Sequence, residues 1–314
     1  MSIRRFQPGR LADVAYTSQA RLGYDPQLAR AEVSRVTKYA VTNKAIPPGI
    51  DTTTPNSARI YDYLLGGKDN FAPDRAAAEQ LVDLSRRTGF DVRESVRANR
   101  AYLVRMVRTL AAAGVHQFLD LGAGLPTQQN VHQVAQAEAP SARVVYVDND
   151  PVVLNHARAL LADSKRTIAV EGDLREPGKI LADPAIRAHL DFEQPVAILV
   201  LSILHFFSDD EQVAEIMATL REALPPGGHL AISHSYVQHS GPNEMDGVRS
   251  VFRKTTAGDI KNRTAEELAV YFDGLELLEP GVVSVETWRP WIDQWPGDPD
   301  HSSYLAAVGR KPLE

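Results

Sequence analysis

The central part of the sequence alternates short apolar runs with stretches of helical spacing. The apolar runs are Phe118–Leu121, Arg143–Val147, Thr167–Val170, Val196–Leu201 and His229–Ser233. Runs of this kind, separated by helices, are typical of parallel strands buried on both faces of a sheet. Two later runs, Leu275–Leu278 and Tyr304–Val308, add two more strands. We therefore expect an α/β protein with a doubly wound, mostly parallel seven-stranded sheet.

The chain before this region divides into two parts. Residues 1–50 hold eight cationic and three acidic residues, and Pro26–Val41 has helical spacing before the break at Pro47-Pro48-Gly49. We expect an N-terminal helical arm that packs on the core or on a second copy of the chain, with a basic lid over an acidic substrate as the alternative. Residues 51–113 are expected to form a helical lid or cap region, and residues 114–314 the core.

Composition and charge exclude several classes of protein. The chain has no cysteine, so it has no disulfide, cysteine-based zinc site or cysteine nucleophile. Its formal net charge of −6 argues against nucleic acid or an anionic membrane as the partner. No apolar run approaches the roughly 20 residues of a membrane helix, and Met1–Gly9 lacks the apolar core of an export signal. We expect a cytoplasmic enzyme.

The most informative motif is the loop at Phe118–Gly124, where a buried strand runs into a glycine turn. Gly122 and Gly124 let the backbone approach a ligand closely, and the next helix presents free N–H groups to it. A dinucleotide-binding loop would need a third glycine where this chain has Thr127. Asp120 would repel a pyrophosphate and attract an ammonium group. The loop therefore favours S-adenosylmethionine over a dinucleotide, and a tight turn without a ligand is the alternative.

Carboxylates follow the next two strands as well. Asp148 ends the second strand, where an acid can accept hydrogen bonds from both ribose hydroxyls. Asn149 or Asp150 could cap the helix that begins at Pro151, which would leave Asp148 free. Glu171-Gly172-Asp173 follows the third strand, and a carboxylate there can accept from an adenine amino group. A fourth signal, Val200–Phe206, follows the fourth strand.

These four signals, in this order, resemble the class I S-adenosylmethionine-dependent methyltransferases, which have a Rossmann-like fold. The resemblance covers about Gly114–Gly309. It implies that the Asp120–Gly124 loop holds the methionyl part of the cofactor, Asp148 the ribose and Asp173 the adenine. The expected cofactor-binding residues are Asp120, Gly122, Ala123, Gly124, Asp148, Asn149, Gly172, Asp173, Leu174 and Ser202.

A narrower resemblance begins upstream of the core. The segment Asn56–Arg75, NSARIYDYLLGGKDNFAPDR, looks like the opening of an actinobacterial methyltransferase family formerly described only as a domain of unknown function. Similar segments are Phe118–Leu125, Ile203–Phe207, Phe272–Gly281 and Trp288–Pro290. The resemblance spans roughly residues 51–310. It implies the fold and the cofactor more firmly than the reaction.

The candidate catalytic residues are two histidines at strand ends. His205 follows the fourth strand, near the expected sulfonium, and His234 ends the fifth. An unperturbed imidazole titrates near about pH 6.5 and could remove a proton from an acceptor. The alternative for each is a wall residue bonded to backbone, since methyl transfer mainly requires alignment of the acceptor. The neighbouring His239 lacks the spacing of a metal site, and we expect no metal.

The segment Tyr61–Asp74 gathers polar residues around the glycine pair Gly66-Gly67. Such a loop is costly to bury unless it binds something, so we expect a lid over the cofactor's carboxylate or the acceptor, with a solvated turn as the alternative. The candidate lid residues are Arg59, Tyr63, Gly67, Lys68 and Asn70, with Lys68 or Arg59 as the cation. The polar insertion Tyr236–Thr264 is expected to line the acceptor pocket or to form a surface helix.

The leading hypothesis is a methyltransferase that acts on an unidentified small molecule, within secondary metabolism, and that binds S-adenosylmethionine and releases S-adenosylhomocysteine. The alternatives are a non-catalytic regulatory protein that binds the same cofactor and an NAD(P)-dependent oxidoreductase. We expect neither nucleic acid nor membrane as a partner. The sequence leaves open the acceptor, the methylated atom and homodimerisation.

Overall fold

The computed structural model describes residues 50–87, 89, 91–126, 129–162, 164–236, 242–291 and 302–313. The chain divides into two units, Met1–Gly49 and Ile50–Glu314, and the described residues all belong to the second. Residues 1–49 of the expected arm, Thr127 and His239 lie outside the described residues. Within these ranges no helix has the length and apolar character to cross a membrane.

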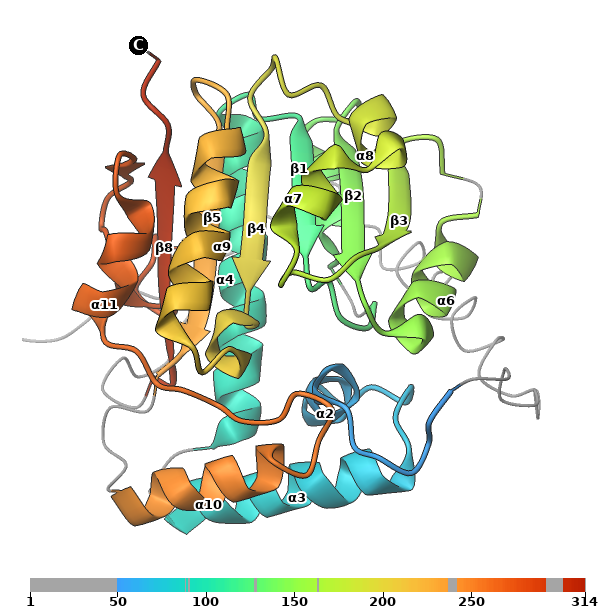
Figure 1. Cartoon of the computed structure of the whole chain (residues 1–314), viewed down its shortest axis with the longest axis vertical. Helices are drawn as coiled ribbons and strands as arrows, with labels where there is room; N and C mark the ends of the chain where they lie inside the picture. Colours follow the sequence, from blue (N-terminus) through green and yellow to red (C-terminus); the bar gives the residue numbers. More distant parts are fainter. Residues whose placement is uncertain are drawn as a thin grey trace, which may run out of the picture. The chain divides into compact units, whose positions relative to one another are not determined.

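One mixed sheet organises the described residues (Figure 1). Its strands are β1 (Gln117–Leu121), β2 (Arg143–Asp148), β3 (Thr167–Glu171), β4 (Ala197–Leu201), β5 (His229–Ser235), β6 (Glu276–Leu277), β7 (Val283–Ser284) and β8 (Tyr304–Arg310). The order is β3-β2-β1-β4-β5-β8-β6, and β7 also pairs with β8. Strands β1 to β5 pair in parallel, and β8 runs antiparallel to β5. The expected doubly wound sheet is confirmed, with the two-residue strand β7 added to the seven expected strands.

Helices cover both faces of the sheet. The helices are α2 (Ser57–Leu64), α3 (Ala72–Arg87), α4 (Val92–Ala112), α5 (Val131–Glu138), α6 (Pro151–Leu160), α7 (Pro177–Ala182), α8 (Pro184–His189), α9 (Asp210–Ala223), α10 (Pro242–Phe252) and α11 (Ala265–Ala269), with single turns η1 (Leu204–Phe206) and η2 (Val270–Phe272). Successive strand residues face opposite sides, so Phe118 packs with α4 and α5 while Leu119 packs with α7 and α9. The apolar strands are therefore buried on both faces of the sheet, as their composition predicts.

Helix α4 packs directly on the sheet. Its Tyr102 is fully buried, and the hydroxyl lies 3.2 Å from the carbonyl oxygen of Ile232 in β5 and 3.1 Å from that of Ala307 in β8. The helix begins at Val92 because the Asp91 carboxylate accepts a hydrogen bond from the Arg93 amide. Helix α4 thus joins the last part of the expected lid region to the core.

Besides the apolar cores on the two faces of the sheet, another apolar cluster lies at the carboxyl ends of the parallel strands. It joins α2, α3 and α10, which gather below the sheet in Figure 1. Ile60 of α2, Leu81 of α3 and Val251 of α10 are buried in it. The insertion after β5 thus packs as a helix against the segment that precedes the core. Together these helices form a cap over the edge where a doubly wound sheet binds its ligands.

Candidate functional site

The loop after β1 is held tightly against its neighbours. Gly122 and Gly124 have φ angles of 73° and 65°, in the left-handed region that favours glycine. The amides of Gly122 and Ala123 donate to the carbonyl oxygen of Val147, at 2.8 and 3.1 Å. A Cβ atom on Gly122 would lie 2.2 Å from Cδ1 of Ile203. The glycines therefore let this loop lie against the ends of both β2 and β4.

Asp148 joins the loops that follow β1 and β2. One carboxylate oxygen accepts from the Gly124 amide and the other from the Asp150 amide, each at 2.9 Å. Burial raises the pKa of Asp148, although these backbone donors act in the opposite direction. The helix cap is Asp150, which accepts from the Val152 amide at 2.7 Å. Asp148 is thus left beside the glycine loop, as the sequence predicts.

Asp120 places a second carboxylate at this edge of the sheet. Its side chain is buried, and burial raises its pKa to about 7. The Arg100 charge lowers this pKa and the Asp148 charge raises it. A buried and a half-buried carboxylate beside a glycine loop suit a positively charged ligand group, because an ionised buried acid needs a cationic partner. These hydrogen-bond acceptors fit the ammonium group and hydroxyls of S-adenosylmethionine, which are donors.

The residues after β3 divide into a paired acid and packing residues. Both oxygens of Asp173 accept from the Arg175 guanidinium, and this interaction lowers the pKa of Asp173. The side chain of Asn149 lowers the same pKa, which brings two of the expected site residues together. A Cβ atom on Gly172 would lie 2.7 Å from Cγ1 of Val147. Leu174 is buried in the core.

The loop after β4 contains a residue with an unusual backbone. Ser202 has a φ of 55°, which is strained for a residue other than glycine. Its amide donates to the carbonyl and hydroxyl oxygens of Ser233, at 2.9 and 3.1 Å. Its hydroxyl shares a 3.0 Å hydrogen bond with that of Tyr304, the first residue of β8. Because β8 runs antiparallel to β5, its first residue, Tyr304, lies at the same edge as Ser202. The sequence pattern alone does not indicate that Tyr304 lies there.

His205 is neutral and nearly inaccessible in this structure. Only 2% of its surface is exposed, and burial holds its pKa well below the usual value. Its Nδ1 accepts a hydrogen bond from the Ser235 amide at 3.2 Å, so the ring proton is on Nε2. In this tautomer the ring has no free lone pair to take a proton. The geometry therefore gives His205 a hydrogen-bond donor at Nε2 and does not favour a general base.

His234 has both ring nitrogens occupied. Nδ1 donates to the Ser235 carbonyl oxygen at 2.7 Å, and Nε2 lies 3.3 Å from Nη1 of Arg263 and accepts from it. Burial lowers its pKa to about 3. The ring thus remains neutral across the physiological range. This arrangement matches the wall residue that was the alternative to a base.

Arg263 is the residue of this region that sequence reasoning missed. Its side chain is 1% exposed. Its guanidinium donates to the carbonyl oxygens of Leu204 and Phe207, at 3.2 and 2.7 Å, and to the carboxylate of Asp210 at 2.9 Å. It therefore holds the whole loop between β4 and α9. An arginine within a polar insertion gives no signal that distinguishes it from a surface cation.

The expected lid residues have different environments. Arg59 is buried, its Nε lies 3.0 Å from the carboxylate of Asp74, and it donates to the Thr54 carbonyl oxygen. It holds this segment together and is not a free cation for a ligand, whereas Lys68 is exposed. The Tyr63 hydroxyl donates to Glu79 of α3 at 2.6 Å.

The turn at residues 66–70, called the lid loop from here on, is built around a buried carboxylate. Asp62 is 2% exposed and accepts from the Asp69 amide at 3.0 Å and from Nδ2 of Asn70 at 2.8 Å. A Cβ atom on Gly67 would lie 1.9 Å from an Asp62 oxygen. Asp69 in turn pairs with His156 of α6 at 3.3 Å and raises its pKa. The lid loop is therefore anchored to α2 and also to the helix that follows β2.

Helix α2 also touches the glycine loop itself. Leu125, Val152 and Val153 form a small buried cluster, against which Ala58 of α2 packs. The cap is thus attached to the candidate cofactor site through apolar contacts as well as through Asp69. Within the described ranges no group of three or more His, Asp or Glu side chains could hold a metal ion.

The chain resembles known proteins both in sequence, by a family model, and in structure. A family model described as S-adenosyl methyltransferase matches residues 43–312. The chain is 43% identical to a candidate methyltransferase of Thermobifida fusca, with a TM-score of 0.77 over 85% of this chain and 98% of that one. It is 40% identical to a DUF574 family protein of Streptomyces avermitilis, with a TM-score of 0.77 over 83% of this chain and 99% of that one. None of the curated proteins matches the chain.

Proposed function

Because the chain belongs to the S-adenosyl methyltransferase family, we propose that it transfers the methyl group of S-adenosylmethionine to a small organic acceptor. The observation that supports the proposal best is the pair of carboxylates beside the glycine loop, of which Asp120 is buried and Asp148 is half-buried. The family assignment removes the nicotinamide alternative. A role in secondary metabolism is part of the proposal.

In this proposal each part of the site has its own task. Asp120 attracts the ammonium group, Asp148 accepts from the ribose, and Asp173 accepts from the adenine while it stays paired with Arg175. When bound, the cofactor supplies an electrophilic methyl group on a good leaving group. The chain's residues then mainly align the acceptor and exclude water.

The acceptor is proposed to lie beside η1. Phe206 packs at 5.3 Å from the ring of Phe252 in α10 and at 4.3 Å from the ring of His205. An aromatic setting of this kind favours a planar, largely apolar acceptor. Nε2 of His205 would orient the acceptor as a donor. Removal of a proton is left to the acceptor's own acidity and to water.

The test is calorimetric titration of the protein with S-adenosylhomocysteine, and with NAD as the control. We expect binding of S-adenosylhomocysteine alone, followed by transfer of labelled methyl groups to a member of an aromatic acceptor panel. Binding of NAD without S-adenosylhomocysteine would overturn the proposal. Cofactor binding without transfer to any acceptor would favour a non-catalytic regulatory protein.

The substitution Asp148→Asn is expected to weaken S-adenosylhomocysteine binding by about 1–3 kcal/mol, because it removes the charge from a hydrogen-bond acceptor. The matched control is Glu171→Gln, which changes an exposed carboxylate at the paired position of β3. Calorimetry measures both affinities. Equal affinities for Asp148→Asn and the wild type would remove this residue from the ribose site.

Cofactor binding is also expected to depend on pH through Asp120. Its pKa of about 7 means that the carboxyl is neutral below pH 7 and charged above it. Affinity for S-adenosylhomocysteine should therefore fall as the pH is lowered, by about tenfold between pH 7.5 and pH 6, where the ligand's ammonium group stays protonated. Asp120→Asn should bind weakly with no such dependence. An unchanged pH profile in this variant would assign the titration to another group.

A further inference from the structure

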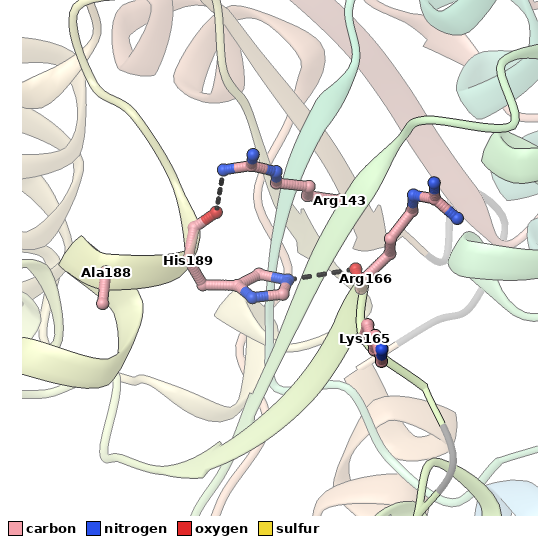
Figure 2. Close-up of a pocket in the computed structure, with 5 residues that line it drawn as sticks. All are labelled: Arg143, Lys165, Arg166, Ala188 and His189. Carbon is pink, nitrogen blue, oxygen red and sulfur yellow. Dashed lines mark hydrogen bonds between the residues drawn. The ribbon is translucent and has the colours of Figure 1, made fainter.

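A basic cavity lies at the opposite edge of the sheet from the cofactor loops. It has a volume of about 400 Å³ and is lined by Arg143, Lys165, Arg166, Ala188 and His189 (Figure 2). Arg143 begins β2, Lys165 and Arg166 precede β3, and the other two residues end α8. Because β2 and β3 are parallel to β1, their first residues lie at the amino-terminal edge of the sheet. We call this feature the β2–β3 cavity.

The walls of the β2–β3 cavity are held by hydrogen bonds among its own residues. Nη1 of Arg143 donates to the carbonyl oxygen of His189 at 3.1 Å. The His189 ring lies 3.0 Å from the carbonyl oxygen of Arg166 and donates to it through Nε2. Figure 2 shows His189 between the two arginines, bonded to each. These bonds fix the side chain of Arg143 and the backbone that carries Arg166, while the side chains of Lys165 and Arg166 stay available to a ligand.

The charge of the cavity is one-sided. Three of its five lining residues are cations and none is an acid. Arg143, Lys165 and Arg166 form no ion pair with another residue in the described part of the chain, whereas Lys179 of the nearby helix α7 pairs with Glu176. The whole chain has a net charge of −6. A local positive cluster of this kind in an acidic protein attracts anions.

The arrangement of the side chains limits the kind of anion. In Figure 2 the guanidinium groups of Arg143 and Arg166 extend to different sides of the cavity, so they do not converge on one tetrahedral oxyanion. An anion with two linked phosphates can reach separated cations, and guanidinium groups match phosphate oxygens well. The volume falls within the roughly 300–1,000 Å³ of small-molecule sites. We propose that the β2–β3 cavity binds a diphosphate-bearing small molecule, independently of the methyltransferase site.

The test is calorimetric titration of the full chain with inorganic pyrophosphate at constant ionic strength. The test variant is Lys165→Gln with Arg166→Gln, because neither side chain has a hydrogen-bond partner in the described residues, whereas Arg143 supports α8. The control is Lys179→Gln, which makes the same kind of charge change outside the cavity. We expect one site, weakened about tenfold or more in the double variant because it loses charged hydrogen bonds, and unchanged in the control.

Two further arms complete the experiment. S-adenosylhomocysteine affinity should be unchanged in the double variant, which shows that the variant is folded and keeps the proposal separate from the methyltransferase assignment. Adenosine diphosphate should bind at least as tightly as pyrophosphate if the ligand is a nucleotide, and less tightly if the free diphosphate is preferred; both results support the site. Pyrophosphate binding that is no tighter than sulfate binding, or is equal in the double variant and the wild type, would overturn it.

Discussion

Arg263→Met is expected to lower the free energy of unfolding by about 3 kcal/mol. The substitution leaves the carbonyl oxygen of Phe207 and Nε2 of His234 without their donor, and removes one of the two donors of the Leu204 carbonyl oxygen. Each buried polar group that loses its partner costs about 1–3 kcal/mol. The salt bridge to Asp210 adds little, because that carboxylate is 59% exposed. The loss therefore comes from the hydrogen bonds that fix the loop after β4.

Urea unfolding followed by circular dichroism measures this effect. The matched control is Lys261→Met, because Lys261 also binds Asp210, at 2.5 Å, but is partly exposed. We expect a loss below about 1 kcal/mol in the control, as for other surface ion pairs. Arg263→Lys keeps the charge but not the planar set of donors, so its stability should lie between the two. Equal losses in Arg263→Met and Lys261→Met would show that the buried hydrogen bonds contribute nothing.

The sequence predicts the sheet well because each strand is marked by a short apolar run of neighbouring residues. An apolar run such as Val144–Val147 is typical of a strand covered on both faces, and the glycine loop marks the edge where ligands bind. Asp148 could be placed for the same reason, since it ends one of these runs. Strand β7 was missed because two residues carry no periodicity, and its pairing depends on β8.

The roles of the polar residues were harder to predict because they depend on contacts between distant segments. The tautomer of His205 is set by the Ser235 amide, 30 positions away in the chain. Arg59 was, with Lys68, one of the two candidates for a free cation, but Asp74 neutralises it inside the cap. Local sequence indicates that such residues are polar and near the site. It does not indicate which of their atoms are already bonded.

Gly67→Ala is expected to displace the lid loop and weaken S-adenosylhomocysteine binding about tenfold. The new Cβ atom would lie 1.9 Å from an oxygen of Asp62, which is buried and held by Asp69 and Asn70. Overpacking of this kind costs about 1–3 kcal/mol, and the displaced carboxylate also loses its two donors. Asp69 then no longer lies where it pairs with His156, so the cap loses a link to the cofactor edge.

The adjacent glycine supplies the control. Gly66 has a φ of 85° and open space around its Cβ position, so Gly66→Ala should cost about 1–2 kcal/mol of stability and leave cofactor affinity unchanged. Adding Asp62→Ala to Gly67→Ala removes the overlapping atoms, and the losses of stability should be less than additive. Calorimetry and thermal unfolding of Gly66→Ala, Gly67→Ala, Asp62→Ala and the double variant separate the two effects. Equal cofactor affinities in Gly66→Ala and Gly67→Ala would mean that the lid loop does not cover the site, since only Gly67→Ala displaces the carboxylate that anchors it.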